Sequence, residues 1–247
     1  MALAKVACNV KACIHASPLR HHVYGNVMWR DAAIRANREN IDISYGVTSK
    51  ELSPLFNSLL DRKVSTLPIL VDANPASAPK SALKHIGIFG NQNSRKGDFM
   101  IPDLVQSLLK LGYKVTVQDS KGRITADQVQ NLIILDYVED LSKEIYKCDL
   151  VLLPYNPSAY KGQSSGIAWE AMACGVPVIA PAETIPGDFV KNHEAGVTFA
   201  EFTVDGIVDS VLLAKSDFKT IALGAFNASN NWAANHGTIK FVEAMLS

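Results

Sequence analysis

Short apolar runs alternate with amphipathic stretches along most of the chain, and one such unit is especially regular. The branched apolar run at 150–153 is closed by Pro154, which is typical of a buried strand of a parallel sheet. After a loop, residues 167–174 are good helix formers without Gly or Pro, and Gly175 ends the run. The apolar residues 176–180 then predict the next buried strand. This stretch is therefore predicted to form a strand, a loop, a helix and a second strand.

The same alternation extends over the rest of the sequence. Helical spacing and caps predict helices at 27–38, 48–60, 100–111, 141–148, 201–214 and 217–226, and another that opens after 182–188. Apolar or alternating runs predict strands at 41–47, 64–71, 84–89, 114–118 and 132–135, and one that ends near 14–17. Residues 126–131 are expected to form a short helix or a loop. Pro68 places the run 64–71 at an edge or at an exit from the sheet. The order of elements predicts an α/β fold with a Rossmann-like, doubly wound parallel sheet.

A change in composition divides the chain. Residues 72–81 are rich in Pro, Ala and Ser, which favours a linker over a packed element. We therefore expect a partial N-terminal α/β segment at 1–72, a linker at 73–83 and a Rossmann-like domain at 84–247.

The loop before the helix at 167–174 has the chemistry of an anion site. Ser164, Ser165 and Gly166 supply a capping hydroxyl and an open backbone, and the unpaired amides and the macrodipole of a helix start attract a phosphate. Glu170, about one turn further on, would repel a phosphate but could accept hydrogen bonds from ribose hydroxyls. The alternative is purely structural, because doubly wound proteins contain this turn whether or not they bind nucleotides.

The run from Glu170 to Ala180, Glu-Ala-Met-Ala-Cys-Gly-Val-Pro-Val-Ile-Ala, resembles the donor-binding domain of GT-B glycosyltransferases. It is most similar to the large retaining group that uses UDP-, GDP- or ADP-sugars. The resemblance implies that Glu170 binds the nucleotide ribose and that the preceding loop, with Ser164 to Gly166, holds the diphosphate. It also implies that the segment before residue 72 is the end of an acceptor-binding domain. Residues 193–199 resemble the family's turn into its last short strand, and residues 232–246 resemble its terminal helix, which crosses back over the first domain.

The resemblance extends to the loop after the strand at 84–89. Lys96 matches a family lysine that neutralises the donor diphosphate, and Arg95 is a second candidate cation. Asn91 stands where the family has a basic residue, and Gln92 beside it is a further candidate contact. The alternative is that Arg95 and Lys96 are solvated loop cations. At the turn after 132–135, the resemblance suggests Tyr137 and Val138 for the nucleobase, although a plain turn is equally compatible.

One departure from the family pattern concerns the donor sugar. The family's second glutamate lies eight positions before the first, where this chain has Gly162, and a longer loop would put Lys161 there instead. Three readings stay open. The chain transfers a sugar from a nucleotide-diphosphate-sugar to an unidentified acceptor, or is a degenerate binding module without turnover, or is a nucleotide-sugar epimerase. The stereochemical outcome is left open.

Composition limits which classes of partner and cofactor are expected. A formal charge of zero and a pI near 7.0 give no basic surface, so no nucleic-acid partner is expected. The chain lacks a dinucleotide fingerprint, a phosphate-binding NTPase loop and an Asp-x-Asp pair, so no cofactor and no metal are expected. The cysteines form no Cys-x-x-Cys pair, and no apolar run is long enough to span a membrane, which together favour a cytoplasmic protein. Peripheral membrane contact and oligomeric state stay open.

Overall fold

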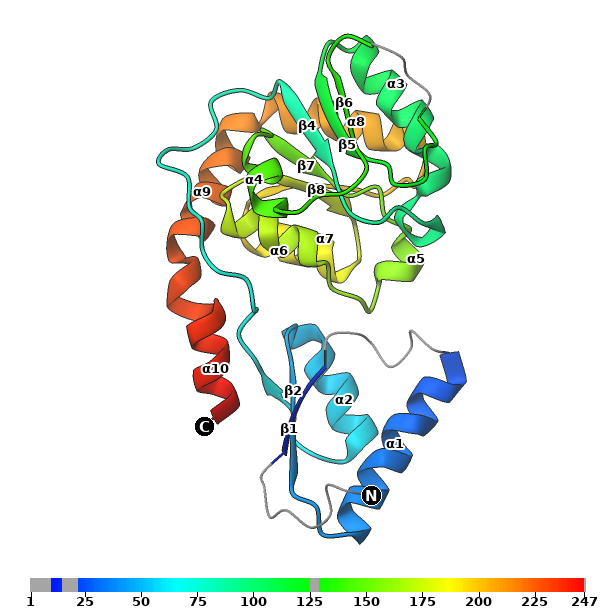
Figure 1. The fold of residues 1–247 in the computed structure, drawn as a ribbon, viewed down its shortest axis with the longest axis vertical. Coiled ribbons are helices and arrows are strands. Elements are labelled where there is room, and N and C mark those ends of the chain that lie inside the picture. The colour runs from blue at the N-terminus through cyan, green and yellow to red at the C-terminus, as the bar shows by residue number, and fades with distance from the viewer. Residues whose placement is uncertain (1–9, 15–21, 125–128, 247) are drawn as a thin grey trace.

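The computed structural model describes residues 10–14, 22–124 and 129–246, and it contains two separate parallel sheets (Figure 1). The first sheet has the order β1-β2-β3, with β1 (Val10–Ile14), β2 (Ile43–Val47) and β3 (Ser65–Thr66). Its helices are α1 (His22–Arg38), the short 3-10 turn η3 (Lys50–Leu52) and α2 (Ser53–Leu60). Phe56 and Leu60 of α2 pack with Val47 of β2 in the core of this unit.

The second sheet has six parallel strands in the order β6-β5-β4-β7-β8-β9. Their bounds are β4 (His85–Ile88), β5 (Lys114–Gln118), β6 (Leu132–Leu135), β7 (Leu150–Leu152), β8 (Val178–Pro181) and β9 (Gly196–Phe199). From β4 the chain first builds outward to β6 and then returns to add β7, β8 and β9 on the other side. Strand order therefore reverses between β4 and β7, which is where open α/β sheets bind ligands.

Helices cover both faces of the second sheet. One face packs on α3 (Ile101–Lys110), α8 (Val204–Ser216) and the first turns of α9 (Phe218–Asn235). The other packs on α4 (Leu141–Tyr146), α6 (Gly166–Ala173) and α7 (Ile185–Asn192). The remaining elements are η4 (Ser94–Lys96), η5 (Asp98–Met100), α5 (Pro157–Tyr160) and α10 (Thr238–Leu246).

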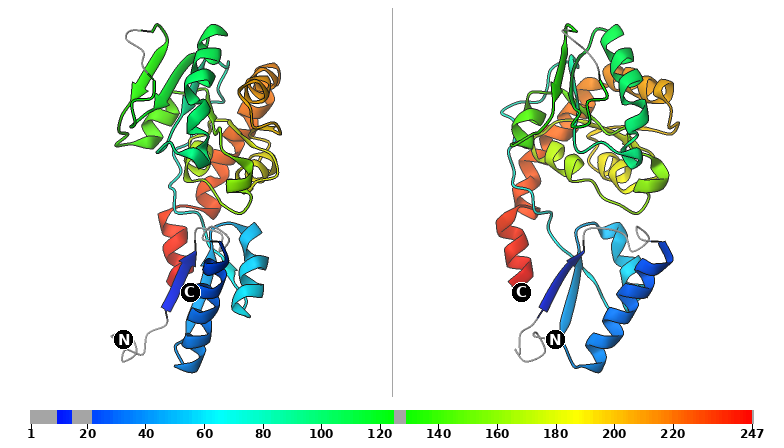
Figure 2. Two further views of the ribbon diagram at one scale, coloured as in Figure 1. Left: turned by 90° about the vertical axis from the view of Figure 1, so that its right-hand side faces the viewer. Right: turned by 45° about the vertical axis from the view of Figure 1, so that its right-hand side comes forward.

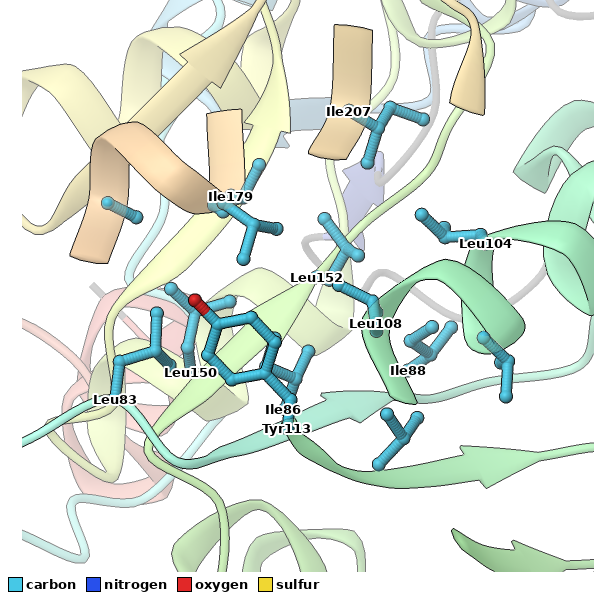
Figure 3. Close-up of a cluster of buried hydrophobic side chains, with 14 of the residues drawn as sticks. Leu83, Ile86, Ile88, Leu104, Leu108, Tyr113, Leu150, Leu152, Ile179 and Ile207 are labelled. Atoms are coloured by element: carbon cyan, nitrogen blue, oxygen red, sulfur yellow. The ribbon is translucent and has the colours of Figure 1, made fainter. Parts of the chain in front are cut away.

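Successive side chains of each strand point to opposite faces of the sheet and so contribute to two separate hydrophobic clusters. Leu150 and Leu152 of β7 point to the face with α3 and α8, whereas Val151 and Leu153 join the opposite cluster. All four are fully buried, as the near-continuous apolar run of a central parallel strand requires. Figure 3 shows the first of these clusters, in which Leu104 and Leu108 of α3 face the strands.

Residues 67–84 contain no helix or strand, and the end of the chain holds them in place. Trp232 Nε1 donates to the Val71 carbonyl at 2.7 Å, and the Gly237 amide donates to the Ile69 carbonyl at 2.9 Å. The helix α10 then runs beside the first sheet, where Lys11 Nζ donates to the Ala244 carbonyl at 2.8 Å (Figures 1 and 2). The predicted linker, 73–83, falls inside this extended segment, while the domain limits themselves stay a prediction.

Several predicted boundaries were wrong. The strand predicted at 64–71 is confined to β3, because Pro68 has no amide to donate to a ladder. The helix predicted at 27–38 begins at His22, and the one at 141–148 ends at Tyr146. The terminal helix predicted at 232–246 is two helices, because α9 continues to Asn235 and the chain turns at Gly237, where φ is +100°. Of the segment expected to be a short helix or loop at 126–131, residues 126–128 lie outside the described residues.

None of the described helices combines the length and the apolar character that a bilayer crossing requires.

Candidate functional site

Three loops that follow the carboxyl ends of strands of the six-stranded sheet contribute to the candidate site. They follow β4 (89–97), β7 (153–165) and β6 (136–140). The Asn156 amide donates to the Arg95 carbonyl at 2.9 Å, which ties the β7 loop to the β4 loop. A Cβ atom added to Gly97, which has a φ of +67°, would collide with the Pro154 carbonyl. The two loops thus pack backbone to backbone beside the point of strand reversal.

Lys96 extends from η4 toward the start of α6. A Cβ atom built on Gly90 would stand 2.5 Å from Lys96 Nζ and 2.5 Å from the Ile167 side chain, so these groups surround one point. The ammonium lies 5.4 Å from the centre of the Tyr155 ring. Burial lowers the pKa of Lys96, and none of the ion pairs among the described residues includes it. A partly desolvated cation of this kind is stabilised by an incoming anion.

The start of α6 faces the same place. Ser165 caps the helix by accepting a hydrogen bond from the Ala168 amide at 3.3 Å, and the Tyr155 hydroxyl lies 3.3 Å from Ser165 Oγ. Gly166 is exposed, and a Cβ atom added there would meet nothing within 4 Å. The first amides of a helix have no intrahelical acceptor, so those of Gly166 and Ile167 are available to a ligand.

Glu170 lies one turn further along α6 and is half-buried rather than turned into the core. Its Oε2 accepts a hydrogen bond of 2.7 Å from Ser142 Oγ at the start of α4. The carboxylate opens onto a pocket of ≈ 570 Å³ whose wall is formed by residues 139–143. Sequence reasoning missed Ser142, because only the tertiary fold brings it next to a residue 28 positions away.

Arg95 is engaged by the β7 loop. Its Nη2 donates to the Ala159 carbonyl at 3.1 Å and to Gln163 Oε1, and the guanidinium lies 5.9 Å from the centre of the Tyr160 ring. These contacts hold the segment that contains Lys161, whose own side chain is exposed. Arg95 therefore positions the loop, and Lys96 is the better placed of the two cations for a phosphate at α6.

The remaining predicted residues lie around this centre. Ser164 is buried beside Ser165, and Asn91 is exposed at the top of the β4 loop. Gln92 is 3% exposed, and neither its amide oxygen nor its amide nitrogen has a hydrogen-bond partner among the described residues. After β6, Tyr137 is 80% exposed and Val138 is half-buried, directly before residue 139, where the wall of the Glu170 pocket begins. Their roles stay predictions.

Within the described parts of the chain, no group of three His, Cys, Asp or Glu side chains is arranged to hold a metal ion. Metal independence stays a prediction.

The two sheets, the reversal of strand order at the site and the returning terminal helix define a GT-B fold. Residues 102–217 match the family model described as Glycosyl transferases group 1. The resemblance to GT-B glycosyltransferases inferred from residues 170–180 is thereby confirmed. No curated protein matches the sequence.

Several solved structures share this fold at low sequence identity. HepE from Anabaena, solved in complex with UDP, is 15% identical with a TM-score of 0.71, and the match covers 96% of this chain and 70% of that one. Sucrose-phosphate synthase from Thermosynechococcus elongatus is also 15% identical with a TM-score of 0.69, covering 95% and 65%. WaaG, a glycosyltransferase involved in lipopolysaccharide biosynthesis, is 17% identical with a TM-score of 0.57, covering 82% and 61%. The chain thus spans 61% to 70% of these structures.

Proposed function

We propose that the chain binds a nucleotide-diphosphate-sugar and takes part in transferring its sugar to an acceptor. The observation that carries this proposal is the convergence of Lys96, the open backbone at Gly166 and the half-buried Glu170 at the reversal between β4 and β7. A cation, free helix amides and a carboxylate one turn away match a diphosphate followed by a ribose. The neighbouring fold of HepE, solved with UDP-glucose, supports the same donor class.

Bond breaking at the sugar carbon sends negative charge onto the departing diphosphate. Lys96 and the amides of Gly166 and Ile167 would meet this charge in fixed positions, so they stabilise the transition state more than the ground state. Because burial lowers the pKa of Lys96, the free site holds its ammonium at a cost that the diphosphate offsets. These groups perform the work that a divalent ion would otherwise do.

Glu170 takes no part in proton transfer in this proposal. Its Oε2 already accepts from Ser142, which fixes the orientation of the carboxylate and leaves Oε1 for a ribose hydroxyl. The adjoining pocket at 139–143 lies on the path from the ribose toward the turn after β6. A nucleobase seated there would lie near Tyr137 and Val138.

A second candidate function is donor binding without turnover. It is favoured by the β7 loop, where Gly162 replaces an acidic residue and where Gln163 is held by Arg95. No carboxylate of this loop is therefore offered to the donor sugar. The two functions differ only in the chemical step, because both require the diphosphate and ribose contacts.

We also infer a cytoplasmic setting. Cys148 and Cys174 are buried free thiols, and burial raises the pKa of Cys148 to about 12 and that of Cys174 to about 11. Such thiols are structural and unreactive, which suits a reducing compartment.

A thermal-shift screen of UDP-, GDP- and ADP-sugars, followed by a hydrolysis assay, tests the proposal. A true donor at about 100 times its dissociation constant should stabilise the chain by about 2.7 kcal/mol. Donor stabilisation with nucleoside diphosphate release supports transferase chemistry, and stabilisation without release supports the binding module. The absence of any shift with all three would refute both.

A further inference from the structure

A second pocket adjoins the six-stranded sheet at the amino ends of its strands, opposite the end that carries the candidate site. It has a volume of ≈ 770 Å³ and is formed where three connections meet. These are residues 81–84 before β4, 111–113 before β5, and 215–220 between α8 and α9. The loops of the donor site follow the carboxyl ends of the strands, whereas this pocket adjoins their amino ends, so the two sites are separate.

Tyr113 supplies the first sign that the pocket receives a ligand. The residue is 3% exposed, and its hydroxyl has no hydrogen-bond partner among the described residues. Figure 3 shows this hydroxyl directed toward Leu83, which lines the same pocket. Burial raises the pKa of Tyr113, so the group stays a hydrogen-bond donor. An orphaned buried hydroxyl is costly, and a ligand acceptor would remove that cost.

The second sign is the start of α9, a helix of 18 residues. Its N-cap residue, Asp217, makes no side-chain capping bond; the same holds for α2 and α3, whereas α4, α6, α7 and α8 are capped by a side chain. The Asp217 carbonyl accepts from the amides of Thr220 and Ile221, as expected inside a first turn. The amides of Phe218 and Lys219 precede these and have no intrahelical acceptor. A long helix thus presents uncapped amides to the pocket.

Charge and shape point to the same kind of ligand. Lys84, Lys215 and Lys219 line the pocket, against one carboxylate from Asp217. The Lys215 ammonium lies 5.7 Å from the centre of the Tyr113 ring, so it stands over the ring of that residue. Leu83 and Phe218 give the pocket an apolar, buried floor. The lining therefore combines an anion site with an apolar surface for the organic part of a small-molecule ligand.

We propose that this pocket binds a phosphate monoester of a small molecule. The phosphate accepts hydrogen bonds from the first amides of α9 and from the Tyr113 hydroxyl, and Lys215 and Lys219 neutralise it. The ester's organic part lies against Leu83 and Phe218. This second site is independent of the donor diphosphate and of the proposed transferase function.

The test is a titration of the full chain, labelled with ¹⁵N, against inorganic phosphate and against glycerol phosphate, followed by NMR. It is run in the Lys96→Ala variant as well, so that binding at the donor site is removed. We expect saturable shifts of the Phe218 and Lys219 amides in both proteins, with glycerol phosphate binding more tightly than inorganic phosphate. Shifts confined to the β4 loop, or lost in Lys96→Ala, would overturn the proposal.

Two variants separate the site from the fold. Lys219→Glu puts a carboxylate at a helix start, which the macrodipole favours, so the chain should keep or raise its Tm while losing phosphate affinity at least tenfold. Tyr113→Phe removes an unsatisfied hydroxyl, so Tm should hold or rise while affinity falls about fivefold. Unchanged affinity in both variants would show that the shifts do not report a built site.

Discussion

Glu170 shows how one residue acquires a role from its place in a helix. It lies one turn inside α6, half-buried, and the Ser142 hydroxyl fixes one of its oxygens at 2.7 Å. Glu170 also lines the open pocket formed with residues 139–143. The proposed ribose contact depends on this intermediate burial, because a fully buried carboxylate could not reach a ligand and a fully exposed one would not be held in one orientation.

Glu170→Gln should weaken UDP binding by roughly 1 to 3 kcal/mol, because a charge-assisted hydrogen bond to the ribose becomes a neutral one. Isothermal titration calorimetry measures this loss. 2′-Deoxy-UDP provides a control, because it lacks one ribose hydroxyl and its affinity should therefore fall less on this substitution. Equal UDP affinity in the wild type and in Glu170→Gln would exclude the ribose contact.

At this scale the resemblance to GT-B glycosyltransferases pointed to Lys96 and Glu170, and the structure places both near the start of α6, while their roles stay predictions. The sequence did not reveal Ser142, nor the capture of Arg95 by Gln163 and the Ala159 carbonyl. Both are contacts across loops, and local sequence carries no signal for the partner of a side chain 28 or 68 positions away.

Among the elements, the turn between η4 and η5 is the one that joins the two halves of the site. Gly97 adopts a left-handed φ of +67°, and its missing Cβ lets the Pro154 carbonyl approach. The Asn156 amide then reaches the Arg95 carbonyl. The glycine therefore serves both a backbone conformation and a close contact between loops.

Gly97→Ala should destabilise the chain by about 2 kcal/mol or more and should also weaken nucleoside diphosphate binding, because the β4 loop is pushed away from β7. Gly122→Ala is the matched control. Gly122 has a φ of +61° but open space around a Cβ atom, so it pays only the backbone cost of about 1 kcal/mol and keeps its ligand affinity. Urea unfolding and calorimetry compare the two. Equal losses of stability would contradict the proposed contact with Pro154.

Element prediction succeeded where the apolar pattern alone decides the outcome. The bounds of β5 and β6 were predicted to the residue, since each is a short branched run between turns. The helix α5 was missed because four residues give no periodicity. The helix predicted at 217–226 continues to Asn235 as α9, because Ser229 and Trp232 are buried, the first beside Gly175 and the second against Val71. Tertiary packing overrode local propensity there.

In the whole molecule, the break between α9 and α10 holds the linker and brings the end of the chain back to the first sheet. The Ile69 amide donates to His236 Nδ1 at 3.2 Å, which requires an unprotonated nitrogen. Burial lowers the pKa of His236, and the charge of His193 lowers it further. The folded chain therefore favours the neutral imidazole.

Because the folded pKa of His236 lies below 6.5, its contribution to stability should be complete above that pH and lost as the pH falls through the folded value. Urea unfolding between pH 7.5 and pH 5 should show the loss. His236→Asn keeps an acceptor for the Ile69 amide but does not titrate, so the free energy of unfolding of this variant should fall less steeply with decreasing pH. Burial also lowers the pKa of His85, which contributes equally to the pH dependence of both proteins. Parallel pH profiles would contradict this role of His236.

Lys96 and the start of α6 are proposed to form one diphosphate site, and the most direct test compares the affinities of two ligands in one variant. Calorimetry of UDP and uridine is carried out with the wild type, with Lys96→Ala and with Lys191→Ala, an exposed lysine on α7. We predict that Lys96→Ala loses at least tenfold in UDP affinity, about 1.4 kcal/mol, while uridine binding and the Lys191→Ala control stay unchanged. Equal losses for UDP and uridine, or no loss of UDP affinity, would contradict the account.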